Sequence, residues 1–175
     1  MSTFERLAVC FVGAALLASG TVQAGAEFGH PATADEVRAW DISIPPDGRG
    51  LPPGSGTAKQ GAAVYAAKCV ACHGERGVGK PADALVGGIG TLASTAPLKT
   101  VGSYWPYATT LFDYVRRAMP YDKPMSLSSD EVYAVSAYIL SLNGIIPEDA
   151  TIDAGTLPKV TMPNRNGFVD YWRQH

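Results

Sequence analysis

The feature that most constrains this chain is a five-residue motif, Cys69-Val70-Ala71-Cys72-His73. Two thiols three positions apart, followed at once by an imidazole, form the C-x-x-C-H pattern of c-type haem attachment. The thiols can reach the two vinyl groups on one edge of a porphyrin, and His73 then falls beneath the iron as a ligand. The motif therefore predicts one covalent haem c, bound by Cys69, Cys72 and His73.

Two other uses of a C-x-x-C pair fit this sequence less well. A redox dithiol would need a thioredoxin-like βαβ pattern, which is not visible here. A zinc site would need a second pair of ligands, and His30 and His175 are isolated. With both thiols used as thioethers, no disulfide is available to the fold.

Residues 1–24 have the pattern of a secretory signal peptide. Arg6 gives a weakly positive start, Leu7–Ala18 is an apolar stretch, and Val22-Gln23-Ala24 offers small residues for cleavage. Export would remove Cys10 and predicts a periplasmic protein. No apolar run reaches the roughly 18 residues needed to span a bilayer. The net charge of -2 and the lack of a basic run argue against nucleic-acid binding.

Residues 25–56 are predicted to form a Pro- and Gly-rich N-terminal arm, in which we expect no helix. Within it, residues 40–44 alternate apolar and polar side chains, as a short strand or an extended arm would. The arm is either a flexible linker or a segment whose Trp40, Ile42 and Ile44 dock on a partner. Residues 145–175 are predicted to be an irregular C-terminal tail, which leaves residues 57–144 as the haem domain.

Three helices are expected inside that domain. The first runs from about Thr57 to Lys68 and places Gly61, Tyr65 and Cys69 on one face, where Gly61 lets another helix approach closely. The second spans Leu111–Ala118, with Thr110 as its cap. The third begins at the Ser128-x-x-Glu131 capping box and ends at Gly144. The predicted fold class is therefore all-α.

Glycines after the motif, at positions 74, 77 and 79, predict a tight loop around the haem edge. His73 needs an acceptor for its second ring nitrogen, and we expect a backbone carbonyl from residues 80–87 to supply it.

The distal iron ligand has five candidates, which are Met119, Met125, Met162, His175 and His30. Met119 is favoured because it follows a predicted helix and precedes Pro120, so its backbone is fixed and its thioether can be aimed. Met125, six residues further on, is the main competitor. Any of these methionines could instead simply fill a gap in the core.

The chain resembles the class I cytochromes c in the segment from Gly61 through His73, in Met119-Pro120 and in the capped helix that ends Tyr138-Ile139-Leu140. The resemblance implies a small helical shell around one haem, in which the first and last helices cross. It also implies that Met119, preceding Pro120, is the distal ligand.

A narrower resemblance is to the cytochrome (SoxD-like) subunit of periplasmic sulfane and sulfite dehydrogenases. It is carried by residues 85–92, 101–110, 116–120 and 162–168. The resemblance implies a molybdenum-containing dehydrogenase subunit as electron donor and other c-type cytochromes as acceptors. Trp105 resembles an aromatic residue that donates its indole N–H toward a haem propionate, although a core tryptophan is the other interpretation.

The predicted function is therefore electron transfer without catalysis by the chain itself. One alternative is a general mobile shuttle with no dedicated enzyme partner. Another is a haem enzyme or gas sensor with an open iron site, which a thioether ligand would block.

Overall fold

The structure is a computed structural model that describes residues 29–173. The predicted signal peptide, residues 1–24, and His175 lie outside the described residues. The chain divides into two compact units, Met1–Asp41 and Ile42–His175. Within the described part of the chain, no helix is long and apolar enough to cross a membrane.

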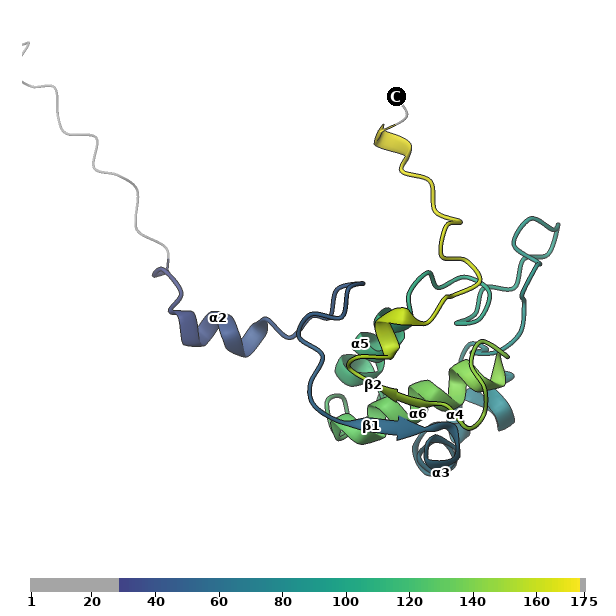
Figure 1. The fold of residues 1–175 in the computed structure, drawn as a ribbon, viewed down its shortest axis with the longest axis horizontal. Coiled ribbons are helices and arrows are strands. Elements are labelled where there is room, and N and C mark those ends of the chain that lie inside the picture. The colour runs from purple at the N-terminus through teal and green to yellow at the C-terminus, as the bar shows by residue number, and fades with distance from the viewer. Residues whose placement is uncertain (1–28, 174–175) are drawn as a thin grey trace, which may run out of the picture. The chain divides into compact units, whose positions relative to one another are not determined.

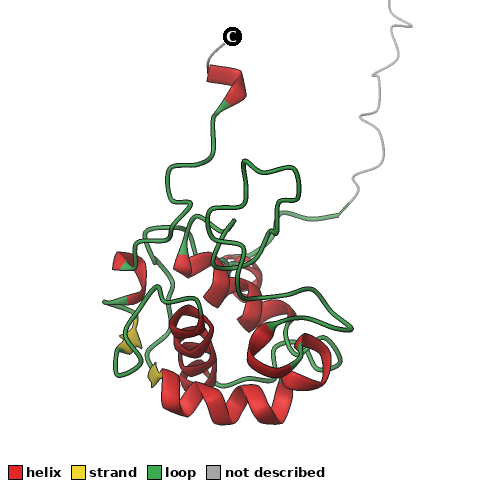
Figure 2. Cartoon of the chain, turned by 90° about the vertical axis from the view of Figure 1, so that its right-hand side faces the viewer, coloured by secondary structure: helices red, strands yellow, loops and turns green. Residues whose placement is uncertain are grey.

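The larger unit is built mainly from helices joined by long loops (Figure 2). Its helices are α3 (Ala58–Lys68), α4 (Val70–His73), α5 (Ala108–Ala118) and α6 (Ser129–Leu142). Short 3-10 turns lie at η2 (Glu75–Gly77), η3 (Leu157–Lys159) and η4 (Tyr171–Arg173).

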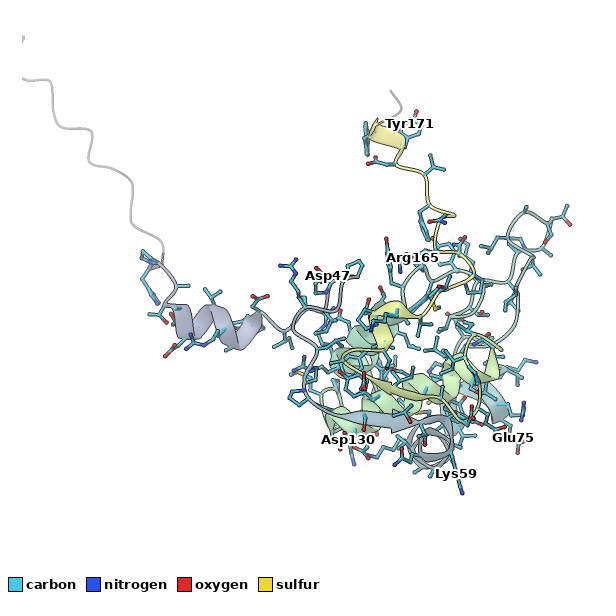
Figure 3. All side chains as sticks on the ribbon, viewed as in Figure 1. Asp47, Lys59, Glu75, Asp130, Arg165 and Tyr171 are labelled. Carbon is cyan, nitrogen blue, oxygen red and sulfur yellow. The ribbon has the colours of Figure 1, made fainter. Side chains whose placement is uncertain are left out.

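The all-α prediction needs a correction, because a small sheet joins the two flanks of the helical domain. Strand β1 (Ser55–Thr57) pairs antiparallel with β2 (Thr151–Asp153), and Gly56 lies opposite Ile152 (Figure 1). A strand of three residues is too short to show a periodic pattern in the sequence. The sheet is attached to α6, because the Ser55 N–H donates to the Asp130 carboxylate at 2.8 Å (Asp130 is labelled in Figure 3).

The crossing of the first and last haem-domain helices is confirmed. Thr57 and Gln60 form a capping box at the start of α3, and Ser128 and Glu131 form the predicted one at the start of α6. A Cβ at Gly61 would lie 1.9 Å from the Ala134 carbonyl oxygen. The two backbones therefore approach so closely that only glycine fits at this position.

Helix α5 begins three residues earlier than predicted. It starts at Ala108, with Tyr107 as an N-cap that makes no side-chain hydrogen bond, so Thr110 lies inside the helix and does not cap it. Ala108 and Thr109 are both buried. Packing of the first turn thus takes the place of a capping side chain, which is why no cap signal marks this end in the sequence.

The expectation of no helix in the N-terminal arm is wrong. Helix α2 (Ala34–Trp40) has a capping box formed by Thr33 and Glu36. It lies in a stretch free of proline and glycine between Pro31 and Pro45, which is long enough for two turns. Trp40 therefore ends a helix, and the backbone from Ile42 to Ile44 forms neither helix nor strand.

Both flanks of the predicted domain contribute to the core of the larger unit. Ile44 is buried, although it was assigned to the arm, and so are Ile152, Leu157 and Met162 of the C-terminal tail. They belong to one apolar cluster with Phe112 and Tyr133, whose ring centroids are 4.5 Å apart, and with Leu140. The residues that hold the helices around the site therefore extend well beyond 57–144.

Candidate haem-binding site

The Cys-x-x-Cys-His motif occupies one short helix and the position before it. Cys69 is the N-cap of α4, and His73 is its last residue. Both cysteines are free thiols; Cys72 is exposed and Cys69 is half-buried. Burial raises the pKa of the Cys69 thiol to about 11, so in this pocket it is a neutral group at physiological pH.

The loop after the motif folds back onto α4 through backbone hydrogen bonds. The Ala82 N–H donates to the Cys72 carbonyl and the Gly79 N–H donates to the His73 carbonyl, each at 2.8 Å. Gly74 has a φ of +72°, and a Cβ there would come 2.5 Å from the Gly79 carbonyl oxygen. The predicted tight glycine loop is therefore present.

The side chain of Tyr65 connects this loop to α3. Its hydroxyl donates to the Gly74 carbonyl at 2.8 Å. Burial raises the pKa of Tyr65 to about 12, so the phenol remains a donor at neutral pH. Tyr65 also packs against Tyr138 of α6, with ring centroids 5.3 Å apart. One residue thus links both crossing helices to the loop behind the motif.

The orientation of His73 is fixed by a backbone carbonyl. Its Nδ1 lies 2.9 Å from the Asp83 carbonyl oxygen. A carbonyl oxygen only accepts, so Nδ1 carries the hydrogen and Nε2 of the neutral ring keeps its lone pair. The predicted acceptor within residues 80–87 is confirmed.

A cavity of about 350 Å³ brings the predicted haem-binding residues together. Cys69, Cys72, His73 and Met119 all line it. Most of the other lining side chains are apolar, among them Leu111 and Val115 of α5, Val135 and Ile139 of α6, Leu85, Val101 and Leu127. An apolar hollow bordered by two free thiols and an imidazole with a free lone pair fits a covalent haem.

Met119 owes its position to α5. The helix ends at Ala118, and Met119 is the extended residue that follows it, immediately before Pro120. Leu111, Val115 and Met119 are spaced four residues apart, which places them on one face of the helix. That face is turned to the cavity, since all three residues line it. This spacing is the sequence signal that could have identified Leu111 and Val115 as wall residues.

The other candidate ligands within the described residues do not line the cavity. The side chain of Met125 is 63% exposed, and Met162, in the C-terminal tail, is buried in the core. His30 belongs to the smaller unit, where its Nε2 is 3.6 Å from a Glu36 carboxylate oxygen. His175 lies outside the described residues.

The charged and aromatic groups at the cavity rim form pairs. Lys68 lines the cavity and donates to Glu131 at 2.7 Å, a hydrogen bond that lowers the pKa of the Glu131 carboxyl. Trp105 and Tyr114 both line the cavity and make an edge-to-face contact, with ring centroids 5.7 Å apart. Trp105 is half-buried, so it belongs to the wall of the site and not to the interior of the core.

Asn143 is a positioning residue that the sequence did not reveal. Its side chain accepts from the Gly87 N–H at 3.1 Å and donates to the Leu85 carbonyl at 3.2 Å. It also donates to the Ile139 carbonyl at 2.9 Å. The amide thus fastens the end of α6 to the loop that supplies Leu85 to the cavity. A lone asparagine beyond a helix gives no pattern from which this role could be predicted.

Comparison with known proteins agrees with this site. A family model described as cytochrome c oxidase, cbb3-type, subunit III matches residues 56–139. The chain belongs to the class I c-type cytochromes, whose members carry electrons and bind haem c covalently.

Among solved structures, it is similar to a chain in the crystal structure of the sulfane dehydrogenase SoxCD from Paracoccus pantotrophus. The two chains share 40% identity with a TM-score of 0.78, and the match covers 85% of this chain and 74% of that one. No curated protein sequence matches this chain significantly.

Proposed function

We propose that this chain is a monohaem cytochrome that accepts single electrons from a molybdenum-containing sulfite or sulfane dehydrogenase subunit and passes them to other c-type cytochromes. The observation that carries the proposal is the single apolar cavity on which Cys69, Cys72, His73 and Met119 converge. The chain itself is the carrier, and the oxidation of the sulfur compound takes place on the partner.

In this proposal Cys69 and Cys72 hold the haem through thioethers, and His73 offers Nε2 to the iron. The bound haem supplies one metal centre that takes up and releases one electron. The hydrogen bond from Nδ1 to the Asp83 carbonyl keeps the imidazole in one orientation and makes it a better electron donor.

Met119 is the proposed distal ligand. It is the only one of the five candidates, within the described residues, that lines the same cavity as His73. A thioether ligand favours the reduced state and raises the reduction potential, and it leaves no open position for oxygen or carbon monoxide. The apolar wall formed by α5 and α6 keeps water from the site and disfavours the more highly charged oxidised state.

The proposed donor rests on the similarity to a SoxCD chain. That protein is a sulfane dehydrogenase, and a likeness of 40% identity over most of both chains supports a comparable electron donor here. Export to the periplasm, predicted from residues 1–24, is part of the same proposal, because it would place the chain with such a partner.

The test is purification of the native complex from the host. We expect the haem-containing fraction to contain molybdenum, and we expect sulfite or thiosulfate to reduce the haem. Mass spectrometry should show one haem added to a chain cleaved near Ala24. Recovery of a haem protein with no molybdenum partner would favour the general mobile shuttle. Carbon monoxide binding by the reduced native protein at neutral pH would favour an open iron site.

A further inference from the structure

The loop that supplies Trp105 to the haem cavity has little regular structure of its own. Val101 and Trp105 line the cavity, and residues 101–107 form turns and irregular backbone up to the start of α5. The indole meets the ring of Tyr114 edge to face, with centroids 5.7 Å apart. One such ring contact fixes a half-buried side chain only weakly. The position of Trp105 therefore depends also on how the backbone on either side of it is held.

Residues 162–168, here called the C-terminal strap, form a turn that begins in the core of the larger unit. The Arg165 N–H donates to the Met162 carbonyl, and the Gly167 N–H donates to the Asn164 carbonyl, each at 3.1 Å. The Met162 side chain is only 1% exposed. Because its first residue is buried in the core, the turn that follows is held at a defined place.

The C-terminal strap contacts the cavity loop both before and after the tryptophan. The Asn164 amide donates to the Tyr104 carbonyl at 2.7 Å, across 60 positions of sequence. The Arg165 guanidinium (Arg165 is labelled in Figure 3) lies over the Tyr107 ring, 4.4 Å from its centroid. Phe168 adds an edge-to-face contact with the ring of Tyr104, with centroids 5.2 Å apart. The strap thus holds the loop at two points that flank the indole.

We propose that the C-terminal strap positions Trp105 in the wall of the haem cavity, with Asn164 and Arg165 as the positioning residues. This inference rests on the haem binding in the proposed function and makes no use of the electron donor. Neither Asn164 nor Arg165 lines the cavity, so both act through the loop. A fixed indole keeps water from this part of the cavity. Water beside the haem favours the more highly charged oxidised state, so the strap raises the reduction potential.

The experiment follows Trp105 by its fluorescence in the full-length holo-protein. The chain has three tryptophans, so Trp40→Phe/Trp172→Phe leaves Trp105 as the only one. Haem quenches the emission of a nearby tryptophan by energy transfer, and an indole that moves into water becomes accessible to acrylamide. Both signals report where the indole lies, and a loss of overall stability alone does not change them in a folded protein.

Four variants are compared in this background. We expect Asn164→Ala/Arg165→Ala to raise the emission several-fold and to make it more sensitive to acrylamide. Asn164→Ala alone, the milder change, should have the same effect at a smaller size. In Asn164→Ala/Arg165→Lys a cation stays over the Tyr107 ring, which should restore part of the wild-type quenching. Asn166→Ala is the matched control, because Asn166 lies in the same turn and, among the described residues, makes no hydrogen bond or ring contact with residues 104–107.

The reduction potential is the second measurement. It should fall in Asn164→Ala/Arg165→Ala and stay unchanged in Asn166→Ala. Emission that remains fully quenched in the folded double variant would overturn the strap proposal, whatever the potential does, because the indole would not have moved. Haem binding and the donor assignment would then still stand. A wild type purified without haem would overturn the haem binding in the proposed function, and the strap proposal with it.

Discussion

The buried carboxylate of Asp113 on α5 accepts a hydrogen bond from the backbone N–H of Ile44, at 3.0 Å, across 69 positions of sequence. Arg117 donates to the same carboxylate, and Arg116 donates to the Ile42 carbonyl at 3.4 Å. The residues that precede the haem domain are thereby fastened to one face of α5. The opposite face of that helix lines the cavity and leads to Met119.

Replacing Asp113 should therefore lower stability. Asp113→Ala leaves the Ile44 N–H without its acceptor in a buried site, and we expect a loss of about 1–3 kcal/mol in the free energy of unfolding. Asp113→Asn keeps an acceptor oxygen and should lose less. Asp47→Ala is the control, because among the described residues the carboxylate of Asp47 (labelled in Figure 3) pairs only with the exposed Arg49. Denaturant unfolding followed by circular dichroism measures all three, and an equal loss for Asp47→Ala would refute the buried-acceptor explanation.

The close contact between Gly61 and Ala134 should reverse the usual effect on stability of replacing a helical glycine by alanine. Alanine in a helix interior is normally about 1 kcal/mol better than glycine. Here the added Cβ would meet the Ala134 carbonyl at 1.9 Å, and backbone atoms cannot move aside as a flexible side chain can. We expect Gly61→Ala to destabilise the protein by about 1–3 kcal/mol. Ala63→Ser, on the exposed side of α3, should change the unfolding midpoint little.

The two methionines that compete for the iron differ in burial. Met119 lines the cavity, whereas the side chain of Met125 is 63% exposed. We expect Met119→Ala to abolish the far-red absorbance band of a ferric methionine–iron bond and to admit carbon monoxide to the reduced protein. Met125→Ala should leave the band intact. The opposite pair of results would transfer the ligand assignment to Met125.

Tyr133 should make the fold sensitive to alkali. Burial raises the pKa of Tyr133 to about 12, and its hydroxyl donates to the Pro52 carbonyl at 2.9 Å. An unfolded tyrosine ionises near pH 10. The folded state thus favours the neutral phenol, so the stabilisation is complete below about pH 10 and is lost as the pH rises through 12.

The check is the difference in unfolding free energy between wild type and Tyr133→Phe as a function of pH. At pH 8 the wild type should be the more stable by about 1 kcal/mol, the value of one hydrogen bond. Between pH 10 and 12 that advantage should shrink and reverse. A difference that stays constant over this range would show that Tyr133 does not ionise on unfolding.

The sequence predicted those parts of the site that depend on neighbouring residues. The Cys69–His73 motif, the Ser128 capping box and the glycine at position 61 each act within one or two turns of helix, and the structure has them as expected. The acceptor for the His73 ring could also be predicted from the sequence, because the loop that directly follows the motif folds back to it.

What could not be predicted depends on contacts between distant residues. Asn143 and Asp113 act through hydrogen bonds to backbone groups far along the chain. Strands β1 and β2 are stable only as a pair, and neither is long enough to be recognised alone. Helix α2 was missed for a different reason: proline and glycine were counted over the whole arm, which hid the Thr33–Glu36 cap in a stretch that contains neither.

Four buried side chains determine which fragment of this cytochrome should fold when it is expressed separately. They are Ile44, Ile152, Leu157 and Met162. The family model ends at residue 139, inside α6, and omits all four of these side chains. A recombinant fragment with those limits would expose the inner surface of its own helices to solvent. The smallest fragment expected to fold runs instead from about residue 42 to the Met162 region. Fusion partners should be attached outside those two points.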